Sequence, residues 1–317
     1  MPDLLSDPAL QGVLAILEIE RAKIAKAQTK GYAFIVVGVV VGIVGATMVI
    51  PVPAIIVGAI SAITGGVFLY RIGDALSSYK SAFKLEVIGH ALKFLDQSLS
   101  INPNAGIGET EFIDTQLFTN SPDRYSTEDL VSGKADKTSF YFAEVNAEYK
   151  TETTTKNGTQ TNWHNIFKGI LFTADFNKNF NGVTVVRPKD FGNALGAWFS
   201  KNLFSIGSKN LVQLENINFE KTFVTHAIDQ VEARYILTPA MMERILALNH
   251  QSKDTVSLSF INTKMYIAFP LDRNCFEAPI FKTLLNPNLL NEDVATIKFM
   301  YDVVREMDLN TRIWNKS

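Results

Sequence analysis

The sequence predicts an α+β protein in which an N-terminal transmembrane hairpin of two helices precedes a mainly antiparallel sheet domain with a few helices. Two observations support this fold class. Residues 31–70 contain no Asp, Glu, Lys or Arg, although these residues make up 20% of the chain. Beyond residue 138, strand-like alternations and hairpin turn signals are interleaved with a few helical patterns, without the regular rhythm of βαβ units.

The charge-free region contains two apolar segments, Tyr32–Ile50 and Val52–Tyr70. Each has 19 residues, which at about 1.5 Å per residue spans a hydrocarbon core of about 30 Å. Pro51 and Pro53 predict a tight reversal between them, because proline lacks an amide donor. Two core helices of a soluble fold are the alternative, but such helices normally keep a polar stripe. We therefore interpret residues 32–70 as a two-helix transmembrane hairpin.

Small residues recur in both apolar segments at four-residue spacing. They are Gly38 and Gly42 in the first segment and Ala54, Gly58, Ala62 and Gly66 in the second. Helices in lipid gain from close backbone approach, which small residues permit, although glycine is also generally common in membrane helices. We interpret the spacing as a packing face, either within the hairpin or between chains of a homo-oligomer.

Basic residues flank the hairpin on both sides, and the reversal is uncharged. They are Arg21, Lys23, Lys26 and Lys30 before it and Arg71, Lys80 and Lys84 after it. Because Lys and Arg are retained in cytoplasmic loops, both termini are predicted to be cytoplasmic. The lipid bilayer is then a partner, and a single cysteine, Cys275, fits a reducing compartment.

Apolar residues at helical spacing continue on both sides of the hairpin, in residues 1–31 and 71–98. The first stripe includes Leu10, Leu14, Leu17 and Ile24, and the second includes Tyr79, Phe83, Val87, Ala91 and Phe94. We expect two amphipathic helices that pack together as a stalk. Helices lying on the membrane surface are the alternative.

Residues 99–137 are rich in Asn, Pro, Gly, Ser, Asp and Thr and are predicted to be a linker or loop. Residues 138–317 are predicted to form a cytoplasmic α+β domain. A strand should begin near Tyr141 and turn at Asn157-Gly158, a strong hairpin signal. Helices are predicted from Asp190, from Pro239 after its cap Thr238, and from Asn291. Strands and a short turn are expected from Leu211 to Val231, and a final hairpin around Asn262.

Catalytic and ligand signatures are weak throughout the chain. The four histidines, at 90, 164, 226 and 250, lack metal-ligand spacing, so neither a metal nor a cofactor is expected. Cys275 is more simply explained as a small buried residue than as a nucleophile. The net charge of −2 gives no reason to expect nucleic acid binding.

One polar constellation lies within an aromatic-rich segment: Glu215, Glu220, Asp229, Glu232 and Arg234. These side chains could form a cleft with paired carboxylates or a clamp on a partner. Alternatively, Arg234 makes a structural salt bridge and the acids face water.

Several linked motifs resemble the bacterial family known as domain of unknown function 3137. They are Phe167-Lys-Gly169, Asp175-Phe-Asn-Lys-Asn-Phe180, Leu214-Glu215, Phe219-Glu-Lys-Thr-Phe223, Asp229, Glu232-Ala-Arg-Tyr-Ile-Leu-Thr-Pro239 and Phe276-Glu277. The resemblance implies a bacterial protein of the cytoplasmic (inner) membrane and brings no assigned activity.

The leading hypothesis is a membrane-anchored interaction or scaffold protein without enzymatic activity, which binds a protein partner at the cytoplasmic face of the membrane. One alternative is a hydrolase or transferase with a site in residues 215–234. A second alternative is a hairpin that forms a pore or remodels the membrane.

Overall fold

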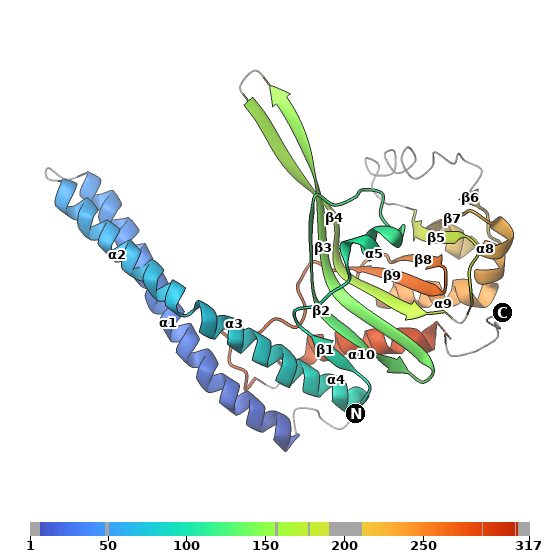
Figure 1. Ribbon diagram of the computed structural model, residues 1–317, viewed down its shortest axis with the longest axis horizontal. Helices are drawn as coiled ribbons and strands as arrows, with labels where there is room; N and C mark the ends of the chain where they lie inside the picture. Colours follow the sequence, from blue (N-terminus) through green and yellow to red (C-terminus); the bar gives the residue numbers. More distant parts are fainter. Residues whose placement is uncertain are drawn as a thin grey trace. The chain divides into compact units, whose positions relative to one another are not determined.

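The computed structural model describes residues 7–47, 51–155, 158–176, 178–189, 211–286, 288–307 and 309. The chain forms two compact units, one of Met1–Phe94 with Phe276–Asp293 and the other of Leu95–Cys275 with Val294–Ser317. The first unit contains the long helices and the second contains the sheet (Figure 1). The helix predicted from Asp190 lies outside the described residues.

Helix α1, Pro8–Ala46, runs without interruption from the amphipathic segment through the first apolar segment. Asp7 caps this helix, because its side chain accepts a hydrogen bond from the N–H of Ala9. Helix α2, Pro51–Arg71, begins directly at a proline, which the first helical turn tolerates because an N–H there would have no helical partner. The prolines predicted to form the reversal therefore lie in the first turn of α2.

Helices α3 (Gly73–Ala82), η2 (Phe83–Ile88) and α4 (Gly89–Leu95) follow α2, and both α3 and η2 pack against α1. The predicted stripe residues Leu10, Leu14, Leu17, Ile24, Tyr79, Phe83, Val87 and Ala91 are buried. Phe94 was expected to continue the stripe but is 39% exposed. The π-helical turn of η2 explains the difference, since its extra residue rotates the buried face toward Ile88 and Leu92.

A non-helical segment, Phe276–Leu285, packs on these helices, and we call it the strap. The hydroxyl of Tyr79 donates a hydrogen bond to the carbonyl of Pro279 at 2.7 Å. Arg21 donates to the carbonyl of Ile280 at 2.6 Å. Backbone groups of the strap, which has no ladder of its own, thus find partners on α1 and α3.

Glu277 adds an ionic contact between the strap and the same helices. Its carboxylate lies 3.4 Å from Nζ of Lys80 and 3.5 Å from Nζ of Lys84. Lys84 is buried, and this carboxylate contributes to the electrostatic compensation of its ammonium.

The second unit contains a nine-stranded sheet in the order β1-β2-β3-β4-β9-β8-β5-β7-β6, and every neighbouring pair is antiparallel. The strands are β1 Ser100–Asn102, β2 Arg124–Ala135, β3 Thr138–Thr155, β4 Gly158–Asp175, β5 Val183–Pro188, β6 Leu211–Val212, β7 Phe223–Ala227, β8 Ser257–Ile261 and β9 Lys264–Pro270. The predicted α+β class with a mainly antiparallel sheet is confirmed.

The helices of this part of the chain are α5 Glu109–Asp114, α7 Ile217–Thr222, α8 Gln230–Ile236, α9 Pro239–Gln251 and α10 Asn291–Glu306. The predictions of α9, α10 and the β8–β9 hairpin are confirmed. Thr238 caps α9 by accepting a hydrogen bond from the N–H of Met241. Between Leu211 and Val231, the short helix α7 separates strands β6 and β7, and α8 begins at Gln230.

The loop predicted for residues 99–137 was wrong, since this region contributes β1, α5 and β2. Strand β2 pairs with β3 but shifts register between Glu128 and Val131, and Asp129 there has a φ of 60°. Such a bulge breaks the two-residue alternation by which a strand is detected from sequence. Backbone pairing with β3 then stabilises a segment whose side chains give little strand signal.

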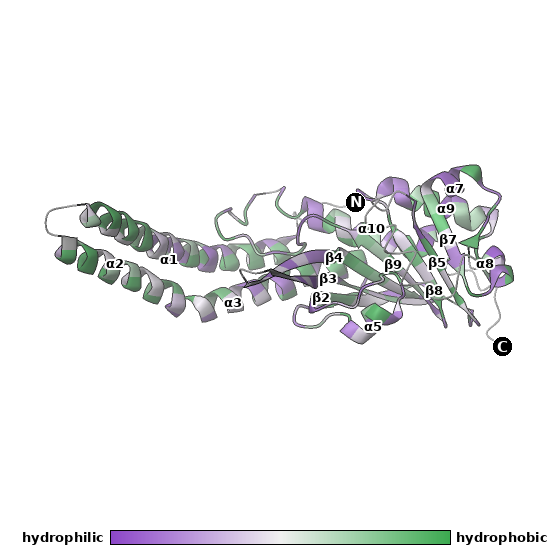
Figure 2. Ribbon diagram, turned by 90° about the horizontal axis from the view of Figure 1, so that it is seen from above, coloured by the Kyte–Doolittle hydropathy of each residue, from purple (hydrophilic) through white to green (hydrophobic). Residues whose placement is uncertain are grey.

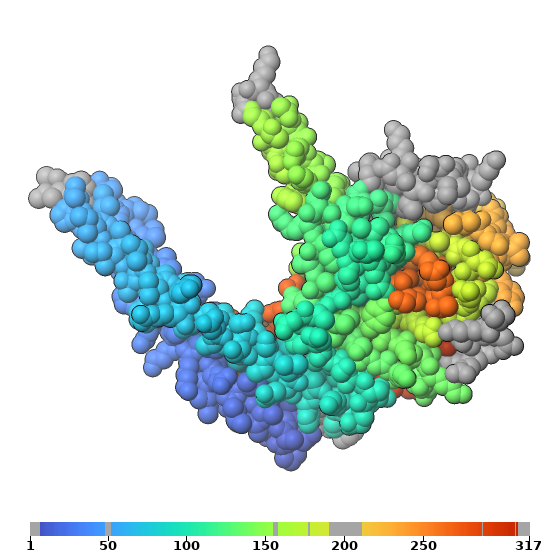
Figure 3. Space-filling model, in the orientation of Figure 1, coloured from blue at the N-terminus to red at the C-terminus, as the bar shows by residue number. Residues whose placement is uncertain are grey.

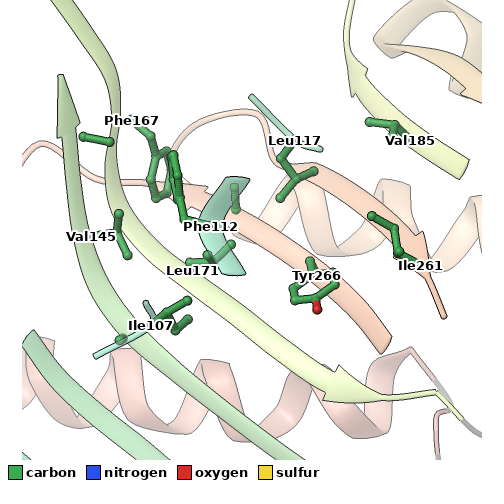
Figure 4. Packing of buried hydrophobic residues seen from close by; sticks show 12 residues of the cluster. Ile107, Phe112, Leu117, Val145, Phe167, Leu171, Val185, Ile261 and Tyr266 are labelled. Carbon is green, nitrogen blue, oxygen red and sulfur yellow. The ribbon is translucent and has the colours of Figure 1, made fainter. Parts of the chain in front are cut away.

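One face of the sheet carries a core of buried apolar side chains beneath α5 (Figure 4). Phe112 of α5 stacks on Phe118 at 4.6 Å and lies 6.5 Å from Phe167 of β4, measured between ring centroids. On the opposite face, Phe269 meets Phe299 of α10 at 5.3 Å. The central strands are therefore covered on both faces.

Candidate functional site

The first candidate site is the outward surface of the hairpin formed by α1 and α2. In Figure 2, α2 and the part of α1 that lies beside it are coloured mainly hydrophobic. Large apolar side chains are exposed there by 46–66%: Val36, Val37, Val39, Val40, Ile43, Val44, Ile55, Ile56, Val57, Ile60, Ile63 and Val67. By length and composition, both helices are able to cross a membrane.

The inner surface of the hairpin is built from small residues. A Cβ added to Gly38 would lie 2.5 Å from the carbonyl oxygen of Gly58 and 2.7 Å from the amide nitrogen of Ala62. A Cβ on Gly45 would clash with that of Ala54. The backbones of α1 and α2 thus approach as closely as small-residue faces allow.

Two of the six predicted packing residues occupy different surroundings. A Cβ added to Gly42 or Gly66 would meet nothing within 4 Å, whereas one added to Gly65 would lie 2.5 Å from the carbonyl oxygen of Gly31. A strict four-residue step drifts by about 40° per step in a helix of 3.6 residues per turn. The three-residue step from Ala62 to Gly65 corrects this drift, so Gly65 and not Gly66 meets α1.

Polar and aromatic contacts also join the two helices. The Ser61 hydroxyl donates to the carbonyl of Phe34 at 2.8 Å, and the rings of Phe34 and Phe68 stack with centroids 5.9 Å apart. Together with the glycine contacts, they establish a packing face within the hairpin of one chain.

The second candidate site is the predicted constellation between residues 215 and 234. Glu215 and Arg234 are exposed, and Arg234 donates to the carbonyl of Gln230 within its own helix. Glu220 accepts a hydrogen bond from the N–H of Leu214 at 3.0 Å. The hydrogen bonds of Arg234 and Glu220 are both local, because each is made to a main-chain group of a residue close in sequence.

The two remaining acids of the constellation also hold backbone. Asp229 caps α8 by accepting from the N–H groups of Val231 and Glu232 at 2.8 and 3.0 Å. The buried carboxylate of Glu232 accepts from the N–H groups of Asn181 and Gly182 at 3.1 and 3.0 Å, with Nζ of Lys178 3.6 Å away. These contacts give both acids a structural role.

A polar cluster on the α5 side of the sheet joins three elements. Nζ of Lys264 lies 2.9 Å from the Glu111 carboxylate and 2.7 Å from the Tyr141 hydroxyl, which itself donates to Glu111. Burial, and then the hydrogen bond to Glu111, raises the pKa of Tyr141. A phenol held protonated in this way is suited to fastening α5 to the sheet rather than to acting as a base.

A cavity of about 370 Å³ lies beside the first half of β2 and the middle of β3 and β4. It is lined by Ser126, Thr127, Glu128, Glu144, Val145, Asn146, Lys168, Gly169, Arg273 and Asn274. Two hydrogen bonds position lining residues of the cavity. The N–H of Cys275 donates to Glu144, and Arg273 donates to Thr296. Among the described residues, no group of three or more His, Cys, Asp or Glu side chains is arranged to hold a metal ion.

Strands β3 and β4 extend beyond their neighbours as a two-stranded arm. Pairing of β2 with β3 ends at Glu148, and pairing of β9 with β4 ends at Gly169. The arm projects from the sheet in Figure 3 and carries mainly Thr, Asn and Gln, with Trp163 41% exposed. Open strand edges of this kind can accept an additional strand from another chain.

The fold and these sites define an α+β protein whose N-terminal hairpin has the length and composition to cross a membrane. Residues 165–309 match the family model described as "Protein of unknown function (DUF3137)". The match bears out the predicted resemblance to this family over residues 165–309. No curated protein matches the sequence.

One solved structure that matches the chain is the crystal structure of the mycobacterial trehalose monomycolate transport factor A, TtfA. The two share 9% identity, with 68% of this chain and 91% of that chain covered and a TM-score of 0.36. At this level of similarity, the match carries no functional argument.

Proposed function

We propose that this chain is a membrane-anchored protein whose sheet domain binds a protein partner at the cytoplasmic face of the membrane. The exposed apolar surface of the α1–α2 hairpin carries the proposal. Leaving one Val or Ile side chain in water rather than in an apolar phase costs about 1.5–3 kcal/mol, and the hairpin presents a continuous series of them. A lipid bilayer removes this cost for the outward surface. The facing surfaces of α1 and α2 already pack against each other.

The proposed orientation, with both termini on the cytoplasmic side, is supported by the basic residues on both flanks of the hairpin. Cysteine scanning tests this in intact cells, in a Cys275→Ala background. A Val52→Cys variant at the start of α2 is expected to react with an impermeant maleimide, and a Gln160→Cys variant in the arm only after lysis. Labelling of position 160 in intact cells would refute the orientation. Release of the chain from membranes by alkaline carbonate would refute the anchor itself.

The arm is the part of the sheet domain best suited to a protein partner, because its strand edges carry backbone groups outside the main ladder. Replacing residues 151–162 by a two-residue Asn-Gly turn removes those edges. The parts of β3 and β4 that pair with β2 and β9 stay intact. In-cell crosslinking of the full-length chain should lose its protein partners in this variant. Identical crosslinking profiles for the parent chain and this variant would show that the arm is not the binding site.

Ligand binding or catalysis in the sheet domain is a second candidate, favoured by the polar cavity beside Glu144 and Lys168. The predicted site in residues 215–234 has contacts that support structure instead. A pore through the hairpin would need several copies, and the described packing face is filled within one chain.

A further inference from the structure

A row of three lysines, Lys23, Lys26 and Lys30, follows one side of α1 and is called the lysine stripe below. At about 100° per residue, the three positions lie within about 60° of one another around the helix. All three side chains are exposed. The buried residues Leu17 and Ile24 lie on the opposite side of α1, where it packs against its neighbours.

The stripe ends where the apolar surface begins. Tyr32 is 50% exposed on α1, and Tyr70 is 87% exposed at the end of α2. These two levels coincide, because a Cβ on Gly31 would contact the Leu69 side chain. Tyrosine is enriched where apolar membrane core meets polar headgroups, so this pair marks the boundary of the span.

Distances along α1 place the stripe at headgroup depth. With a rise of about 1.5 Å per residue, Lys30, Lys26 and Lys23 lie about 3, 9 and 14 Å beyond Tyr32. Headgroup regions account for about 5–8 Å on each side of a bilayer, and lysine side chains extend further toward them along an apolar surface. All three ammonium groups are therefore within a Debye length of about 8–10 Å of lipid phosphates.

The lysines of the stripe form no ion pair within the part of the chain that the structure describes. Their neighbours differ in this respect. Arg21 is paired with Glu18 at 2.8 Å, and Lys80 and Lys84 share Glu277. The chain thus neutralises the basic groups near the strap and leaves those nearest the boundary available to an external anion.

We propose that the lysine stripe binds the phosphate headgroups of anionic phospholipids. This rests on the membrane anchoring proposed above and adds the class of lipid. Juxtamembrane basic residues gain about 1 kcal/mol each from an anionic surface, which corresponds to about a fivefold change in affinity per lysine. Arg71, which is exposed at the end of α2, extends the same basic level to the other side of the hairpin.

The test compares the full-length chain with a Lys23→Gln, Lys26→Gln, Lys30→Gln variant in detergent, by native mass spectrometry with phosphatidylglycerol and phosphatidylcholine. Phosphatidylglycerol should bind the parent chain preferentially, and the triple variant should lose about 100-fold in its affinity. The matched control is Lys134→Gln, Lys137→Gln, Lys253→Gln, which removes the same charge from the sheet unit and should bind like the parent.

Equal affinities of the triple variant and the control for phosphatidylglycerol would overturn the proposal. Displacement of the lipid by millimolar inorganic phosphate would also overturn it, since the site would then recognise free phosphate. Alkaline carbonate extraction distinguishes a failure of the lipid-binding proposal from a failure of the proposed membrane anchoring. The triple variant should stay in the membrane, because the apolar surface of the hairpin is unchanged.

Discussion

Replacing Gly38 by alanine should destabilise the α1–α2 hairpin, whereas the same replacement at Gly42 should not. Both residues lie inside α1 at four-residue spacing, so any gain of about 1 kcal/mol in helix propensity is the same for both. Only the Cβ on Gly38 would strike backbone, at 2.5 Å from the carbonyl oxygen of Gly58. Comparing the two variants therefore isolates the clash.

The size of the effect follows from the separation that the clash requires. Carbon and carbonyl oxygen need about 3.3–3.6 Å, so the helices must part locally by about 1 Å. A gap of 0.5–1 Å forfeits about a quarter to a half of each dispersion contact, and overpacking typically costs about 1–3 kcal/mol. Gly38→Ala should therefore shift the packing equilibrium about 5- to 150-fold relative to Gly42→Ala.

The assay is SDS-titrated unfolding in mixed micelles, followed by energy transfer between labels at positions 34 and 68. The rings of Phe34 and Phe68 stack at 5.9 Å in the packed hairpin, so labels at these sites separate when it opens. A Cys275→Ala background keeps the labelling specific. Equal unfolding free energies for the Gly38 and Gly42 variants would refute the close approach of α1 to Gly58.

Two further predictions concern the sheet unit. Asp229→Ala should lower the unfolding free energy by about 1 kcal/mol through loss of the α8 cap, whereas Glu215→Ala should change it by less than about 0.5 kcal/mol in chemical denaturation. Burial, and then the charge of Arg187, lowers the pKa of His226 to about 4. In the unfolded chain His226 has its ordinary pKa of 6.5 and becomes protonated below that pH, whereas in the folded chain it stays neutral down to about pH 4. The free energy of unfolding therefore falls as the pH is lowered from about 6.5 to about 4. His226→Gln should flatten that part of the pH profile, and an unchanged slope would contradict the assignment.

The elements predicted correctly from sequence are those whose signals are local. Thr238-Pro239 contains both the cap and the first residue of α9, so the start of this helix needs no distant information. The turn between β8 and β9 is similar, since Asn262 adopts the positive φ of 55° that asparagine tolerates. The apolar hairpin was equally clear, because composition alone separates its helices from the rest of the chain.

The errors arise where tertiary pairing outweighs local pattern. Strand β2 contains a bulge at Asp129, which places consecutive apolar residues out of alternation. Helices α7 and α8 have only 6 and 7 residues, too few to display a helical period. The constellation of acids around Glu232 was likewise ambiguous, since a carboxylate that holds a loop and one that binds a ligand look identical in sequence.

The strap changes how the N-terminal helices should be understood. It lies inside the family region, residues 165–309, yet its hydrogen-bond partners lie on helices outside that region. Burial raises the pKa of Tyr79 to about 12, so its phenol remains a neutral donor to Pro279 at any physiological pH. A fragment beginning after Leu95 would leave the strap carbonyls and the Glu277 carboxylate without these partners. Each hydrogen bond lost in this way contributes about 0.5–1.5 kcal/mol, so partner binding is better tested by shortening the arm than by removing the helices.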